Sequence, residues 1–87
     1  MKTYRIKPLE WRHCLNDVLE QFSASVIGGV YEVERRIGRN DWLWQFDDGG
    51  DDAPEYCICR TAAEGKALAE ADWRETITRF LEEVTHE

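Results

Sequence analysis

Apolar and polar residues alternate with a period of two through much of the first sixty residues, and this pattern predicts β-strands. The clearest case is the pair of alternating runs at residues 22–26 and 30–37, which flank Gly28 and Gly29. Glycine enters the positive-φ positions of a tight turn without steric cost, so a glycine pair between two such runs is typical of a hairpin. We therefore expect residues 22–37 to form a β-hairpin.

A third strand is predicted over residues 42–47, after a turn at residues 38–41. Its alternation places three aromatic side chains on one face: Trp42, Trp44 and Phe46. Such a face is the natural packing surface for a helix, although two of its tryptophans are also candidates for an apolar anchor in a protein interface. Residues 55–60 are extended and long enough for a further short strand.

The chain before the hairpin is harder to interpret. Residues 4–11 alternate, but Pro8 interrupts them and favours an edge strand or an irregular extended segment. Residues 13–21 place apolar side chains at spacings of three and four, which suits one short helix, while the alternation that follows from Phe22 favours strand. Whether residues 13–21 form this helix or a loop stays open.

The last part of the chain carries the signals of one long helix over residues 62–84. Thr61 and Glu64 form a capping box, which satisfies free N–H groups in the first turn. On a helical wheel one side collects Ala62, Gly65, Ala69, Trp73, Thr76, Ile77, Phe80 and Val84. This stripe is small at its start and large at its end, so we expect Trp73 and Phe80 to lie in the core.

These elements predict an α+β fold: an antiparallel β-meander of three to five strands packed against one long C-terminal α-helix. At 87 residues the chain is expected to be one domain, strand-rich over residues 1–60 and helical over residues 62–84. Four Trp, three Tyr and three Phe supply the bulk that such a small core needs. No stretch approaches the ~20 apolar residues of a membrane span, so we expect a cytoplasmic protein and no membrane partner.

The formal charge of −7 is concentrated in the second half, where residues 40–87 hold thirteen acidic and four basic side chains. Such a field disfavours direct nucleic-acid binding and attracts basic partners. Its densest part is a loop that carries Asp47, Asp48, Asp51, Asp52 and Glu55. The spacing does not fit an EF-hand calcium loop, which leaves a solvated loop or a partner-binding surface for a basic protein.

No catalytic constellation is recognisable, and we predict neither enzymatic activity nor a cofactor. His13 and Cys14 with Cys57 and Cys59 could supply four zinc ligands, but their spacing does not match that of common zinc sites. The alternative is that these thiols are reduced and buried, where they act as small apolar groups. The sequence also contains no phosphate-binding P-loop, no Gly-x-Gly-x-x-Gly motif and no serine nucleophile elbow.

Several fragments together resemble a group of small phage and prophage accessory proteins of uncharacterised function: Ile6-Lys7-Pro8-Leu9-Glu10-Trp11, Gly29-Val30-Tyr31-Glu32-Val33, Trp42-Leu43-Trp44 and the helical stretch from Ala63 to Arg74. The chain departs from the usual pattern in a longer segment between Trp11 and Phe22 and in its added acidic loop. The resemblance implies an accessory protein in the cytoplasm of a bacterial host.

Many proteins of this size and acidity act by occupying a host or defence-system protein. The leading hypothesis is a noncatalytic binder, of which an anti-CRISPR-like inhibitor that presents carboxylates in place of nucleic-acid phosphates is one form. A phage structural, assembly or homo-oligomerising protein, such as a homodimer, is the first alternative. A thiol metal-binding protein is the second.

Overall fold

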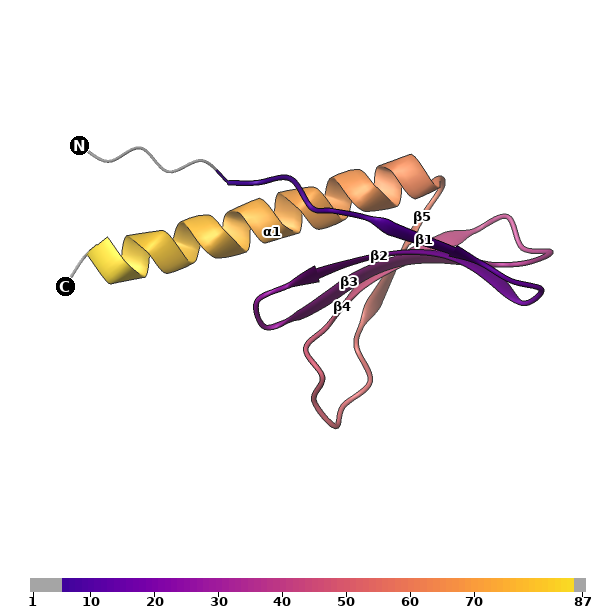
Figure 1. Ribbon diagram of the computed structural model, residues 1–87, viewed down its shortest axis with the longest axis horizontal. Helices are drawn as coiled ribbons and strands as arrows, with labels where there is room; N and C mark the ends of the chain where they lie inside the picture. The colour runs from indigo at the N-terminus through magenta and orange to yellow at the C-terminus, as the bar shows by residue number, and fades with distance from the viewer. Residues whose placement is uncertain (1–5, 86–87) are drawn as a thin grey trace.

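The computed structural model describes residues 6–85, with side chains through residue 82. It is an α+β fold in which a five-stranded sheet packs against one C-terminal helix (Figure 1). The elements are β1 (Arg12–Leu15), β2 (Leu19–Val26), β3 (Gly29–Arg36), β4 (Trp42–Asp47), β5 (Tyr56–Cys59) and α1 (Ala62–Thr85). Each strand pairs antiparallel with the one before it, in the order β1-β2-β3-β4-β5. The predicted meander and helix are confirmed.

The predicted hairpin is formed by β2 and β3, and its two glycines have different tasks. Gly28 takes the positive φ of 97° that the turn requires. Gly29 begins β3 opposite Val26, and a Cβ there would lie 2.3 Å from the carbonyl oxygen of Asp47. The first glycine therefore allows the turn, while the second allows the close approach of β4.

The helical interpretation of residues 13–21 is wrong, and the loop interpretation holds only for residues 16–18. These residues form β1, a tight turn and the start of β2, with His13 opposite Phe22. The turn is held by the side chain of Asn16, whose Oδ1 accepts the N–H groups of Val18 and Leu19 at 2.8 and 2.9 Å. An Asx turn offers the backbone acceptors that a helix would otherwise supply, and pairing with β3 then extends β2 as a strand.

The segment before β1 lies outside the sheet. Residues 6–11 form no strand, which agrees with the irregular alternative, whereas residues 4 and 5 lie outside the described part of the chain. Figure 1 shows this segment running beside α1. The N–H of Leu9 donates to Glu70 Oε1 at 2.9 Å, and the buried Leu9 side chain joins the core. This segment thus covers part of the helix and not an edge of the sheet.

Helix α1 begins where the capping signal places it, since Thr61 Oγ1 accepts the N–H of Glu64 at 3.0 Å. Its first half lies closest to the sheet. Gly65 and Ala69 are buried, and a Cβ at Gly65 would lie 2.7 Å from Val33 Cγ1. Small residues at the start of the stripe therefore set the distance between helix and sheet.

The core forms around Tyr31, which is 1% exposed. Its ring centroid lies 4.8 Å from that of Phe46, and those of Trp44 and Trp73 both lie 6.5 Å away. The Tyr31 hydroxyl donates to Asp72 Oδ2 at 2.5 Å. Burial, and then this contact, raise the pKa of Tyr31 well above its ordinary value, so the hydroxyl keeps its proton.

The expectation that Phe80 lies in the core is wrong, because its side chain is 58% exposed. Trp73 is half-buried and does pack against the core. A helix of 24 residues is about 36 Å long, and Figure 1 shows that α1 extends past the strands beneath it. Phe80 belongs to the projecting part. Within residues 6–85, α1 is not apolar enough to cross a membrane.

Candidate functional site

The acidic loop between β4 and β5 projects away from the sheet and the helix (Figure 1). Two of its carboxylates shape the loop itself. Asp47 Oδ1 accepts the N–H of Gly49, and Asp48 Oδ1 accepts that of Gly50, both at 2.8 Å. These Asx turns account for two of the five predicted site residues and give the loop a defined backbone path.

The remaining three carboxylates, those of Asp51, Asp52 and Glu55, are exposed. None of them takes part in the ion pairs or side-chain hydrogen bonds found among the side chains of residues 6–82. Across the described residues, no group of three or more His, Cys, Asp or Glu side chains is placed to hold a metal ion. The loop therefore presents negative charge to solvent and to any docking surface.

The four candidate zinc ligands are not brought together. His13 and Cys14 lie on β1, at one edge of the sheet, whereas Cys57 and Cys59 lie on β5 at the other edge. His13 stacks on Phe22 with ring centroids 4.4 Å apart, and its Nε2 lies 2.8 Å from Glu20 Oε2. The imidazole is thus held by its own edge of the sheet.

The two thiols of β5 differ in their surroundings. Cys59 is buried beneath α1, and Cys57 is exposed. Burial raises the pKa of the Cys59 thiol, and the negative charge of Glu64 and the neighbouring Cys57 add to this shift. Cys59 therefore stays protonated and packs as a small apolar group. The expectation of buried thiols is confirmed for Cys59 and is wrong for Cys14 and Cys57, which are exposed.

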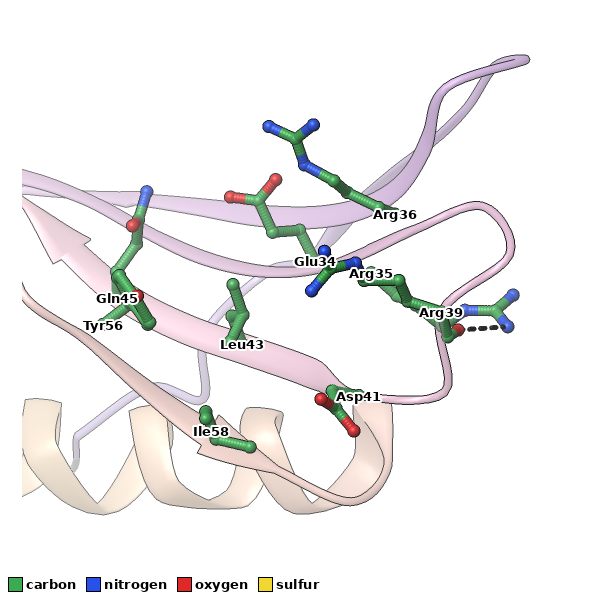
Figure 2. Close-up of a pocket in the computed structure, with 9 residues that line it drawn as sticks. All are labelled: Glu34, Arg35, Arg36, Arg39, Asp41, Leu43, Gln45, Tyr56 and Ile58. Carbon is green, nitrogen blue, oxygen red and sulfur yellow. Dashed lines mark hydrogen bonds between the residues drawn. The ribbon is translucent and has the colours of Figure 1, made fainter.

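A hollow of about 390 Å³, which was not predicted from the sequence, lies near the turn between β3 and β4. Figure 2 shows side chains entering it from β3, β4, β5 and the turn. Its walls are formed by Glu34, Arg35, Arg36, Arg39, Asp41, Leu43, Gln45, Tyr56 and Ile58. The hollow combines charge at the turn with an apolar wall on β5.

Arg35 is the best-held cation of this hollow. Its guanidinium carbon lies 5.4 Å from the ring centroid of Trp42, Nη2 lies 3.4 Å from Glu20 Oε1, and Nη1 donates weakly to the carbonyl of Arg39 at 3.5 Å. Arg36 and Arg39 are exposed. One arginine is therefore structural, and two present their charge to solvent.

The face of the sheet away from α1 divides into a polar and an apolar part. In the polar part, Glu32 accepts hydrogen bonds from Gln21 and Gln45 at 2.6 and 3.5 Å. In the apolar part, Leu43 lies opposite Ile58, and Tyr56 precedes Ile58 by two residues on the same face. The Tyr56 and Ile58 side chains are 61% and 69% exposed.

This apolar strip, Leu43, Tyr56 and Ile58, was missed because sequence reasoning placed residues 55–60 in extended structure without a register. The signal was nevertheless present. Trp42 and Trp44 face the helix, so Leu43 between them must face outward, where polar residues normally stand. An apolar side chain at an outward position of the sheet is a feature that folding of a single chain does not require.

Comparison of the chain with models of known protein families, with curated proteins and with solved structures finds no match.

Proposed function

We propose that this chain is a noncatalytic accessory protein of a phage or prophage that binds a host or defence-system protein with a basic surface in the bacterial cytoplasm. The observation that carries the proposal is the projecting loop, on which Asp51, Asp52 and Glu55 are exposed and free of ion pairs within residues 6–82. The setting comes from the resemblance to phage accessory proteins. The form of this function that suits an acidic loop is an inhibitor that occupies a nucleic-acid-binding surface, where its carboxylates take the place of the phosphates.

The loop has two physical properties that suit this role. Its carboxylates are concentrated in a chain segment of net charge −9, residues 40–87, which raises the association rate with a basic surface through long-range attraction. Its backbone is shaped in advance by the Asx turns of Asp47 and Asp48. A preshaped loop loses less conformational entropy on binding than a flexible one.

The test is affinity capture with the tagged protein against host nucleases and CRISPR complexes, followed by titration of any captured protein. The variant Asp51→Asn/Asp52→Asn removes two exposed charges and leaves both Asx turns in place. The matched control, Glu10→Gln/Asp17→Asn, removes two exposed charges from other parts of the surface.

We expect the loop variant to weaken binding by about tenfold at low salt and the control to change it little, because the charges that matter are local to the contact. Binding of the wild-type protein should also weaken as salt is raised. Equal capture by wild type and loop variant would refute the role of the loop.

A further inference from the structure

Strand β5 leaves one of its two sides open. It is the edge strand of the sheet and pairs only with β4. Among the described residues, no further backbone or side-chain hydrogen bond reaches residues 56–59. An open edge presents N–H and C=O groups that readily pair with another strand.

The side chains beside this edge are of the kind that interfaces bury. Tyr56 and Ile58 stand exposed on the outer face, and Leu43 of β4 adjoins them. The opposite edge, β1, differs at the equivalent outer positions, which are held by Arg12 and Cys14 beside Ser23 and Gln21. The apolar strip is therefore a property of the β5 edge.

We propose that two copies of this chain pair antiparallel through β5 around a twofold axis, which joins their sheets into one of ten strands. A twofold axis perpendicular to a sheet requires a residue of the central strand to face its own copy. With Cys57 at the axis, Tyr56 lies opposite Ile58 of the second copy, and the reverse pair forms by symmetry. With Ile58 at the axis, Tyr56 would face Arg60 instead. The first register buries all four apolar side chains.

The charges along β5 favour the same arrangement. The chain before β5 is acidic up to Glu55, and the chain after it continues with Arg60. Antiparallel pairing brings the acidic end of each strand beside the basic end of the other, whereas parallel pairing would bring like charges together. Glu55 of one copy then lies beside Cys59 and Arg60 of the second. In this arrangement the tips of the two acidic loops, which carry Asp51 and Asp52, still project away from the joined sheet.

The second copy also completes the hollow near the turn between β3 and β4. Ile58 forms part of its wall (Figure 2). In the proposed register Tyr56 of the second copy lies directly opposite Ile58, so its ring adds to the rim of the hollow. This gives each hollow a lining from two chains.

The first experiment measures the mass of the full chain by light scattering and sedimentation over a concentration series. Wild type should approach twice the 10.2 kDa of one chain. Ile58→Lys places a charge in the apolar strip and should raise the dissociation constant at least tenfold. Leu15→Lys changes a side chain of similar exposure on the β1 edge and should leave the dimer intact. Both positions are exposed, so both variants should fold, and circular dichroism checks this.

The second experiment uses the native thiols as reporters. Opposed residues in antiparallel strands have Cα atoms about 4.5–5.5 Å apart, which is within the range of a disulfide. Diamide, which takes up the two electrons and two protons of the thiols, should link two chains rapidly through Cys57. The Cys14→Ser variant should retain this link. The Cys57→Ser variant, which keeps the exposed Cys14, should lose it.

The proposal is overturned if wild type stays monomeric throughout the series, if Leu15→Lys and not Ile58→Lys dissociates the dimer, or if the covalent link follows Cys14. The inference is independent of the proposed function. Ile58→Lys leaves the loop charges in place and should still capture a basic partner, whereas Asp51→Asn/Asp52→Asn should still dimerise.

Discussion

Helix α1 approaches β3 closely at Gly65, and this packing decides whether Gly65→Ala stabilises or destabilises the protein. A Cβ at this position would lie 2.7 Å from Val33 Cγ1 and 3.0 Å from Cys59 Sγ. Distances below 3.0 Å are essentially never seen for real Cβ atoms, so a neighbouring atom must move. Val33 is completely buried. Its methyl groups cannot swing out into solvent, so we expect Gly65→Ala to force α1 and β3 apart.

Two opposing terms decide the magnitude. Alanine is favoured over glycine within a helix by ~1 kcal/mol, which would stabilise the protein. Overpacking a well-filled core costs ~1–3 kcal/mol. Because the clash falls on a completely buried side chain, we place it in the upper part of that range. The net expectation for Gly65→Ala is a destabilisation of ~1–2 kcal/mol.

Urea denaturation of four proteins tests this reasoning: wild type, Gly65→Ala, Val33→Ala and the double variant. Val33→Ala removes the Cγ1 that alanine would meet, at its own cost of about 2 kcal/mol for the lost methyl groups. In that background Gly65→Ala should become neutral or stabilising by up to ~1 kcal/mol. The double-mutant cycle thus predicts a change of sign, which a pure propensity effect cannot produce.

Ala67→Gly supplies the matched control, because Ala67 lies on α1 and is exposed. Its cost measures helix propensity alone and should be ~1 kcal/mol. If Gly65→Ala stabilises the wild-type protein by the amount that this control indicates, the tight contact between α1 and β3 does not exist.

Three further predictions concern stability. Tyr31→Phe should cost about 1 kcal/mol at neutral pH through loss of the bond to Asp72. Because the pKa of Tyr31 is raised, its contribution is complete below pH 10.0 and declines as pH rises above it, so in denaturant melts the gap between wild type and Tyr31→Phe should narrow; a constant gap contradicts this. Trp73→Ala should cost about 3 kcal/mol of stability because Trp73 packs against the core, and Phe80→Ala less than about 1 kcal/mol because Phe80 is exposed. Equal thermal midpoints for the two variants would contradict this difference in burial. Asn16→Ala should cost ~1–2 kcal/mol and Asn16→Asp little, because aspartate keeps the acceptor; a loss with both would show that Oδ1 is not what holds the turn.

The parts of the fold that follow from local chemistry were predictable. The β2–β3 hairpin depends on Gly28, which adopts a φ of 97° at the turn. The start of α1 depends on the Thr61 hydroxyl, which accepts the N–H of Glu64 three residues later. Both signals act within a few residues, so they are visible in the sequence. The third strand with its aromatic face follows in the same way from alternation alone.

Residues 13–21 show where local reasoning ends. Spacings of three and four between Leu15, Val18 and Leu19 satisfy a helical pattern, yet Leu15 and Val18 are both 62% exposed at a hairpin turn. The helix would have needed a surface to bury that face. The choice between helix and hairpin is made by the strand that β3 offers to residues 19–26, and this contact is not local.

Phe80 illustrates a different limit. A helical wheel reports the angle at which a side chain leaves the helix, but not whether another element lies beneath it at that height. Ala69 and Phe80 share the stripe, yet only Ala69 lies over the sheet and is fully buried. The length of the helix relative to the sheet decides the difference, and only the assembled fold contains that information.

The acidic loop was predicted as a charged feature, while the apolar strip beside it required the register of β5. Both features lie outside the buried core, and this has a physical consequence. None of the side chains that are buried among the described residues belongs to the loop or the strip, so these two features contribute little to folding. These buried side chains are Leu9, Ala24, Tyr31, Val33, Cys59 and Ala69. Exposed apolar groups on an open edge promote association, and concentrated carboxylates repel their own kind, so neither feature benefits an isolated chain. Polar changes at Ile58 or Asp51 should therefore leave the melting midpoint nearly unchanged while they alter association or partner capture. If such changes lower stability as much as Trp73→Ala does, these surfaces serve the fold itself and not an interaction.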